Sequence, residues 1–316
     1  MSLVFLIPQG GFGKFPQKAY EGNAVKEFGQ GQKLAWYPGE NMQIIENQVF
    51  DEERALYGSH ALTVRNCRFD GPADGESAFK ECSYITVEDC FFNLRYPFWH
   101  NHGLVIKNCE LTELCRAALW YSDHITIEET KLHGIKALRE CNGAFFKDCD
   151  IISPEFGWST NTIQMVDCSA VSEYFLMRAQ NIFFRNVNFK GKYSFQYIEN
   201  ATLENCSFNT KDAFWHSKNV TVSNCVVEGE YLAWYSENLT MVNCKIIGTQ
   251  PFCYCKNLRL IDCEMIDTDL CFEKSDVQAT ITTPVISIKN PRSGKIHVPA
   301  VTEVIRDDPQ ALGEIF

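Results

Sequence analysis

A repeat of 19 residues is the feature that most constrains the fold of this chain. One copy is Val-Thr-Val-Ser-Asn-Cys-Val-Val at 220–227, in which apolar residues alternate and a cysteine occupies the sixth place. The cysteine slot recurs every 19 residues at Thr130, Cys149, Cys168, Val187, Cys206, Cys225, Cys244 and Cys263. Earlier slots fall at Asn47, Cys67, Cys90 and Cys109, with intervals of 20, 23 and 19, and then 21 to Thr130. A short repeat with this alternation is typical of one coil of a β-solenoid.

The repeat runs from Met42 to Phe272. It predicts an all-β, single-stranded, right-handed parallel β-helix of about 12 coils, because parallel strands joined by short crossovers wind right-handed. We expect residues 1–41 to form an N-terminal extension or cap, 42–276 the β-helix, and 277–316 a partial coil, a cap and a tail. Leu-Ala-Trp-Tyr at 34–37 resembles the residues at 232–235, so an N-terminal half-coil is one option. A biological start at Met42 is the other.

If the coils stack directly, the residues at equivalent positions of successive coils form columns along the molecule. One column is apolar in nearly every coil, as at Phe195, Phe214 and Phe252, and is expected to face inward. Columns of Asn and Asp border the template, and we interpret them as corners, where these residues tolerate left-handed backbone and bond one another from coil to coil. Every insertion falls between a cysteine slot and the next aromatic segment, and the largest lies around residues 70–76.

The net charge and the cysteine content bear on the binding partners and on the cellular compartment that we expect for this chain. A net charge of −11 argues against nucleic acid and against an anionic membrane surface. Nine of the 15 cysteines occupy the repeating slot, where stacked thiols point in parallel and cannot bridge. We therefore expect reduced, buried thiols and a cytoplasmic location. Leu3–Ile7 is too short an apolar run for a signal peptide or a membrane span.

The main candidate site is an outward stripe made of two neighbouring columns. One column holds five of the six tryptophans, and the next holds Glu, His, Tyr and Arg. Flat rings beside ionisable groups suit sugar recognition, because rings stack on pyranose faces while polar groups bind hydroxyls. The alternative is that the tryptophans only cover the solenoid wall. The candidate ligand-binding residues are Trp99, Trp120, Tyr121, Trp158, Trp215, His216, Trp234 and Tyr235, with Arg95 and Arg116 near the insertions.

Catalytic candidates on this stripe are Glu140, Arg139, His100 and Arg178, which could form an acid–base cluster. Glycoside hydrolysis needs two carboxylates at a set separation, and Glu81 lies three coils, roughly 14 Å, from Glu140. The motifs of polygalacturonases and of calcium-dependent lyases are absent from the sequence. If the chain is an enzyme, we expect an activity like that of a polysaccharide lyase or a glycoside hydrolase.

Two short motifs have the spacing of metal ligands. They are His100-Asn-His102 and Cys253-Tyr-Cys255, and neither has an expected second pair close by in the fold. We therefore predict no metal site and no cofactor. A column of mixed charge beside the stripe is interpreted as a solvated face. Its members are Glu53, Glu76, Arg95, Arg116, Glu173, Lys192, Lys211 and Glu230.

Five short segments stand out in order along the chain: Glu-Arg-Ala-Leu-Tyr at 53–57, Tyr-Pro-Phe-Trp at 96–99, Arg-Ala-Ala-Leu-Trp-Tyr at 116–121, Asp-Ala-Phe-Trp at 212–215 and Lys-Asn-Pro-Arg-Ser-Gly at 289–294. With these segments, the chain resembles a bacterial family of right-handed β-helices of unknown function, placed among the pectin-lyase-like proteins. The resemblance covers 42 to the C-terminus and implies a fold without an established activity. Our leading hypothesis is a cytosolic β-helix that binds or modifies an oligosaccharide along the stripe. The alternative is a structural scaffold or oligomerisation module, and a homo-oligomer is open in either case.

Overall fold

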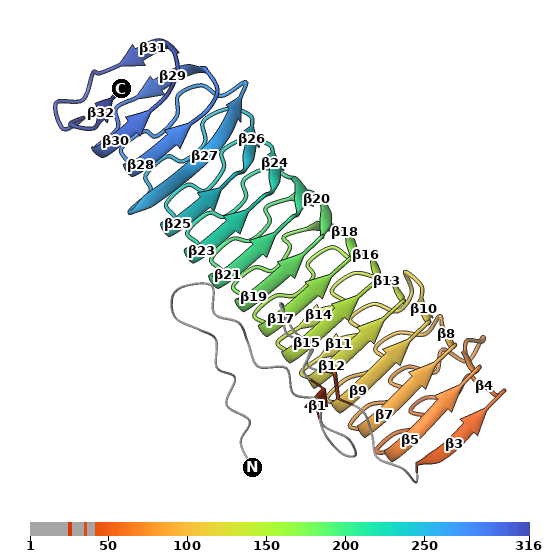
Figure 1. Ribbon diagram of the computed structural model, residues 1–316. Coiled ribbons are helices and arrows are strands. Elements are labelled where there is room, and N and C mark those ends of the chain that lie inside the picture. Colours follow the sequence, from red (N-terminus) through yellow and green to blue (C-terminus); the bar gives the residue numbers. More distant parts are fainter. Residues whose placement is uncertain (1–24, 27–34, 37–41) are drawn as a thin grey trace.

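The structure is a computed structural model that describes residues 25–26, 35–36 and 42–316. These residues form an all-β parallel β-helix of about 14 turns of about 19 residues, seen as a stack of rungs in Figure 1. The predicted fold class is confirmed, and the predicted 12 coils are close to the observed number. The further turns lie at the C-terminal end, where the cysteine template has already been lost.

Each coil supplies one long strand to a parallel sheet that runs the length of the molecule. In register, Val220 lies beside Leu239, and Val222 lies beside Met241, so residues 19 apart stack directly. The strands of this long-strand sheet are β3 (Gln43–Glu46), β5 (His60–Arg65), β7 (Ser83–Glu88), β9 (His102–Lys107), β12 (Asp123–Glu128), β15 (Asn142–Lys147), β17 (Asn161–Val166), β19 (Gln180–Arg185), β21 (Glu199–Glu204), β23 (Lys218–Ser223), β25 (Glu237–Val242), β27 (Leu258–Ile266), β28 (Asp276–Ile281), β30 (Ser293–His297) and β32 (Glu314–Ile315).

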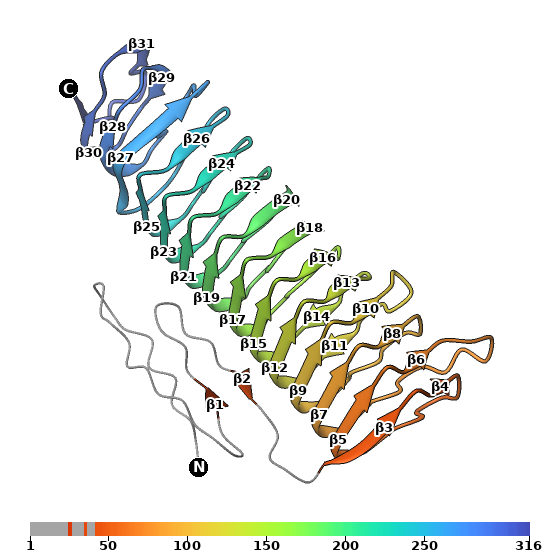
Figure 2. The same ribbon diagram turned by 45° about the vertical axis from the view of Figure 1, so that its right-hand side comes forward.

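A second side of the coil carries shorter strands, which stack in the same way (Figure 2). They are β4 (Val49–Phe50), β6 (Arg68–Phe69), β8 (Phe91–Phe92), β10 (Glu110–Leu111), β13 (Lys131–His133), β16 (Asp150–Ile152), β18 (Ser169–Glu173), β20 (Asn188–Lys192), β22 (Ser207–Asn209), β24 (Val226–Glu228) and β26 (Lys245–Ile247). The third side is mostly a succession of turns, with one short pair, β11 (Leu119–Trp120) and β14 (Leu138–Arg139). This turn side carries the stripe expected from the sequence.

The prediction that Asn47 occupies the first position of the cysteine column is wrong. Strand register places Glu46 beside Arg65 and Val49 beside Arg68, so Gln48, not Asn47, lies opposite Cys67. The interval is therefore 19 rather than 20. Asn47 instead belongs to a corner column, because its backbone is left-handed, with φ of 57°, and its side chain accepts a hydrogen bond from Asn66.

The interior is a stack of apolar side chains from all three sides of the coil. Phe195 and Phe214, in neighbouring coils, stack with ring centroids 4.8 Å apart and planes 6° from parallel. All 15 cysteines are free and buried, as the sequence predicts. In the slot column, the Cys225 sulfur accepts a hydrogen bond from the Cys206 backbone N–H at 3.2 Å. The thiols are therefore packing groups that also satisfy the backbone.

The corner interpretation of the Asn columns is confirmed. In one column, Asn219 donates its side-chain amide to Asn200 at 3.1 Å and accepts that of Asn238 at 2.9 Å. All three residues have left-handed backbone, with φ between 54° and 59°. Asparagine is favoured at such a position because its short polar side chain tolerates left-handed geometry and bonds locally.

At the C-terminal end, β28, β30 and β32 continue the long-strand sheet, and β29 (Val285–Lys289) pairs in parallel with β31 (Val301–Ile305). Near the start of the chain, β1 (Val25–Lys26) and β2 (Ala35–Trp36) form a short antiparallel pair, and β2 lies along the side of the solenoid, beside β9 and β12. The rest of the expected extension 1–41, including the ends of the 34–37 segment, lies outside the described residues. Among the described residues, no helix is long and apolar enough to cross a membrane.

Candidate functional site

The stripe on the turn side depends on a backbone irregularity that repeats in each coil. A regular strand sends successive side chains to opposite faces, so two neighbouring outward residues need a break in the alternation. The break is a left-handed residue in the second column, as at Tyr121, Tyr197, His216 and Tyr235, with φ between 54° and 60°. Consequently Trp215 is half-buried and His216 is exposed, while the flanking Phe214 and Ser217 are buried. Both predicted columns therefore reach the surface.

The tryptophans of the first column pack on one another rather than presenting open faces. Trp99 and Trp120 stack with centroids 5.2 Å apart and planes 2° from parallel, and Trp215 and Trp234 stack at 5.3 Å and 4°. Every indole Nε1 in the column donates to a backbone carbonyl of the next coil. The pairs are Trp99 to Ala117 at 2.5 Å, Trp120 to Lys136 at 2.7 Å, Trp158 to Tyr174 at 2.6 Å, Trp215 to Tyr231 at 2.6 Å and Trp234 to Gln250 at 2.8 Å.

This geometry favours the alternative interpretation of the tryptophans as part of the wall. Each indole is half-buried, its N–H is satisfied within the protein, and in the two stacked pairs one ring covers the other. The sequence placed these residues correctly on one stripe. It did not show that the stacking surface needed for a sugar ring is already occupied.

The four catalytic candidates do not meet in one cluster. Arg139 lies between Trp120 and Trp158, with its guanidinium carbon 5.2 and 5.3 Å from the two ring centroids, and its Nε is 3.4 Å from Glu140. His100 stacks on Tyr121 at 5.1 Å. The expected acid–base cluster is therefore incorrect beyond the Arg139–Glu140 pair. Backbone hydrogen bonds show the reason, since one whole coil separates Glu140 from His100 and another separates it from Arg178.

The second column contains a ladder of four aromatic rings, Tyr197, His216, Tyr235 and Tyr254, which we call the Tyr/His ladder. Successive centroids are 4.9, 4.9 and 4.8 Å apart, and the planes lie within 11° of parallel. Tyr197 is 50% exposed and Tyr235 is 47% exposed. Within the described part of the chain, the side-chain hydroxyls of Tyr197 and Tyr235 and the ring nitrogens of His216 make no hydrogen bond, whereas the backbone N–H of each residue donates to the next coil. Burial, followed by the nearby Glu273 carboxylate, raises the pKa of Tyr254 above its usual value.

The two arginines near the insertions have different surroundings. Arg95 is held by the inserted loop, 2.6 Å from Asp74 and 2.9 Å from Glu76. Arg116 is exposed and forms no ion pair with any residue that the structure describes. Farther along the mixed-charge column, Lys192 pairs with Glu173 at 3.1 Å and Lys211 with Glu230 at 2.8 Å. All four side chains are 44–52% exposed, as expected for a solvated face.

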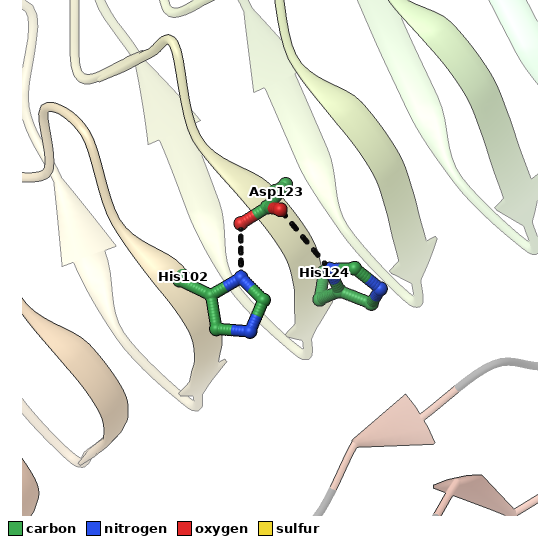
Figure 3. Close-up of side chains that lie close together, drawn as sticks. All are labelled: His102, Asp123 and His124. Carbon is green, nitrogen blue, oxygen red and sulfur yellow. Dashed lines mark hydrogen bonds and ion pairs between the residues drawn. The ribbon is translucent and has the colours of Figure 1, made fainter. Parts of the chain in front are cut away.

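A cluster of His102, Asp123 and His124 lies at the start of β9 and β12, on the long-strand sheet. The sequence singled out His102 only for its spacing from His100, and the expectation that no further ligand residue lies close to it is wrong. His102 Nδ1 is 2.7 Å from Asp123 Oδ1, and His124 Nδ1 is 3.3 Å from Asp123 Oδ2 (Figure 3). Burial alone would raise the pKa of Asp123, but the two imidazoles outweigh it and hold that pKa below its usual range. Reading residue pairs across the 21-residue interval of this coil would have found the cluster, because His102 lies directly beside Asp123 in register.

A family model described as "Protein of unknown function (DUF3737)" matches residues 43–314. The chain belongs to this family. The membership in a family of unknown function that the sequence motifs implied is thereby confirmed. The match begins at residue 43, close to residue 42, where the resemblance read from the sequence begins. A comparison with curated proteins found no match.

Solved structures similar to this family member are β-helical proteins of low sequence identity. PfbA, a surface adhesin of Streptococcus pneumoniae, has a TM-score of 0.41 and 7% identity, over 83% of this chain and 82% of that one. The A-module of the Azotobacter vinelandii mannuronan C-5 epimerase AlgE4 has a TM-score of 0.29 and 13% identity, over 82% and 87%. A tailspike of E. coli bacteriophage HK620, solved with a hexasaccharide, has a TM-score of 0.29 and 10% identity, over 89% and 71%. Likeness at this level carries no argument about function.

Proposed function

We propose that this chain is a non-catalytic binding protein for an oligosaccharide, and that the Tyr/His ladder is its binding surface. The observation that carries the proposal is the row of exposed polar ring edges. Tyr197, His216 and Tyr235 present hydroxyl and imidazole groups from three successive coils, with ring centroids 4.9 Å apart, and these groups have no hydrogen-bond partners in the described part of the chain. A rigid row of groups that both donate and accept suits a polymer with many hydroxyl groups.

The mode of binding differs from the one that the sequence suggested. Inside the ladder each ring face covers the next, so a sugar can only bond to the ring edges there. At the end of the ladder, the face of Tyr197 turned toward the coil of Arg178 has no ring partner among the described residues. One pyranose ring can stack on that face while the exposed Arg178 guanidinium bonds its hydroxyls. The ladder would then bind the following sugar units through their edges.

Binding is favoured over hydrolysis by the positions of the carboxylates. On the stripe, Glu81 and Glu140 lie three coils, roughly 14 Å, apart, which exceeds the roughly 5–9.5 Å between glycosidase carboxylates. Glu140 also faces the guanidinium of Arg139, which is held between two indoles. The proposal therefore assigns no bond-breaking step to this surface.

A glycan array screened with the full chain, followed by calorimetric titration of the best glycan, tests the proposal. We expect the double substitution Tyr197→Phe and Tyr235→Phe to weaken binding about 10-fold, since each lost hydrogen bond is worth about 0.5–1.5 kcal/mol. Tyr57→Phe is the matched control, because Tyr57 is exposed at the other end of the molecule and bonds Glu81. Absence of any bound glycan, or equal affinity of the double variant, would refute the proposal.

A rigid scaffold is the second candidate, and the indole hydrogen bonds favour it. Five tryptophans tie neighbouring coils together through side chain to backbone bonds, which stiffens the turn side over much of its length. A chain that binds no glycan but forms dimers in analytical ultracentrifugation would support this candidate.

A further inference from the structure

The cluster of His102, Asp123 and His124 lies on the long-strand sheet, on a different side of the coil from the Tyr/His ladder. One ligand atom from each residue, an imidazole nitrogen or a carboxylate oxygen, lies within 4.8 Å of the other two. The two rings lie next to each other on one side of the Asp123 carboxylate, with centroids 5.0 Å apart and planes at 63° (Figure 3). The side chains are 47%, 38% and 31% exposed, so solvent reaches the cluster.

The backbone of His124 explains how its ring reaches Asp123. His124 has left-handed geometry, with φ of 54°, and it stands in the column that is an Asn ladder farther along the molecule. Here the residues opposite it in the two flanking coils are Gly103 and Gly143, which have no side chains. His124 therefore cannot continue a ladder, and its ring is free to turn toward the carboxylate one residue earlier.

One ring nitrogen of the cluster is buried and has a single polar contact. The Nδ1 atom of His124 is buried, yet it makes no hydrogen bond with any described residue. It lies 3.3 Å from Asp123 Oδ2, the longer of the two contacts drawn in Figure 3. A buried polar atom that makes no hydrogen bond calls for an explanation, and a bound ion is one such explanation. A cation placed between this nitrogen, the carboxylate and His102 would satisfy it.

We propose that His102, Asp123 and His124 bind a divalent transition metal ion of the zinc type. Two imidazoles and one carboxylate form a donor set that suits Zn²⁺, Ni²⁺, Cu²⁺ or Fe²⁺, whereas Ca²⁺ and Mg²⁺ prefer oxygen ligands. Ligand atoms about 2.1 Å from Zn²⁺ stand roughly 3.4 Å apart in a tetrahedral site. The two His–Asp separations of 2.7 and 3.3 Å would open slightly on binding, and the separation between the two imidazole nitrogens, at most 4.8 Å, would adjust by rotation of the exposed side chains. Three protein ligands leave a fourth position for water.

The test is calorimetric titration of Zn²⁺ into the full chain after chelator treatment, repeated with Co²⁺ to record the visible spectrum. We expect one ion per chain and a Co²⁺ spectrum of a nitrogen and oxygen site. His124→Asn keeps a residue suited to left-handed backbone, and Asp123→Asn keeps the shape of the carboxylate. Each should weaken Zn²⁺ binding at least about 10–100-fold, the loss already caused by changes in outer-shell partners of metal ligands.

His133→Asn is the matched control. His133 forms a similar pair with Asp150 at 2.9 Å on the short-strand sheet, but no third metal ligand lies close to that pair among the described residues. The His133→Asn variant should bind Zn²⁺ as tightly as the unaltered chain. No binding by the unaltered chain, equal binding by His124→Asn, or a Co²⁺–thiolate charge-transfer band from the cysteines would overturn the proposal. None of these outcomes depends on glycan binding.

Discussion

Trp215 lies directly over Trp234, with ring centroids 5.3 Å apart, and its indole Nε1 donates to the backbone carbonyl of Tyr231 at 2.6 Å. The same bond joins each tryptophan of the column to the coil that follows it. The most conspicuous aromatic residues of the sequence therefore hold coils together. The chemistry open to a ligand lies one residue later, in the Tyr/His ladder.

Trp215→Phe tests this structural role. Phenylalanine keeps a stacking ring but cannot donate to Tyr231, whose half-buried carbonyl loses its partner. We expect the free energy of unfolding, measured with urea, to fall by about 1–2 kcal/mol. Tyr197→Phe, which removes an exposed hydroxyl without a partner in the described structure, should change it by less than about 0.5 kcal/mol. Equal effects of the two substitutions would contradict the role assigned to the indole.

Gly229→Ala should be among the most destabilising single substitutions in the chain. Gly229 has φ of 147°, and an added Cβ would lie only 1.4 Å from the backbone carbonyl oxygen of Thr210 in the preceding coil. Because a backbone atom is in the way, the coils must separate, and we expect a loss of at least about 3 kcal/mol.

Gly58→Ala is the control for Gly229→Ala. Gly58 also has a positive φ, of 65°, but nothing lies within 4 Å of an added Cβ. Only the cost of left-handed backbone remains, about 1–2 kcal/mol. Thermal and urea unfolding of both variants measure the difference, and a larger loss for Gly58→Ala would show that the crowding at Gly229 is relieved without cost.

The Asn ladder can be divided into its backbone and side-chain contributions. Asn219→Gly keeps the left-handed geometry but removes the bonds to Asn200 and Asn238, which should cost about 1 kcal/mol. Asn219→Ala removes the same bonds and adds the strain of a left-handed alanine, for a total of about 2 kcal/mol. If urea unfolding gives the same free energy of unfolding for both variants, the strain of left-handed backbone does not explain why this column contains Asn.

The buried thiols predict a loss of stability at alkaline pH. Burial raises the pKa of Cys82 to about 11, of Cys115 to about 12 and of Cys255 to about 11, against an ordinary value of 9.0. The unfolded chain therefore releases these protons first, so the stabilisation is complete below pH 9 and is lost as the pH rises from 9 toward 11–12. Each such thiol should contribute about 1 kcal/mol of loss per pH unit in that window.

Urea unfolding from pH 7 to 10.5 measures this loss. Cys255→Ser should reduce the slope of unfolding free energy against pH, because it removes one buried thiol. Serine fits at this position, since Ser236 and Ser275 already fill the same column and Ser275 donates to the Phe252 carbonyl there. A stability that stays constant up to pH 10.5, or a slope that Cys255→Ser leaves unchanged, would contradict the assignment. In the folded chain below pH 9, the thiols should also fail to react with a disulfide reagent.

Reading columns from the sequence worked where each position has one role in every coil. The inward Phe column, the Asn corners and the free buried cysteines were all predicted from spacing and residue type. The assignment failed at Asn47, where a polar residue in the first coil could belong to either of two adjacent columns. It also failed for the catalytic candidates, because His100 and Arg178 stand in the same column as Glu140 but each lies two coils away from it.

By itself, the sequence determined the solenoid, its register beyond the first coil and the two columns that reach the surface of the turn side. The physical reason is that a slip of one residue would turn a whole apolar set outward, so only one stacking of the coils buries it. Only the tertiary structure decided which ring faces are covered, which indoles are bonded and that His124 turns toward Asp123. Those outcomes depend on side-chain torsions and on left-handed backbone at single positions, and the 19-residue period does not specify either.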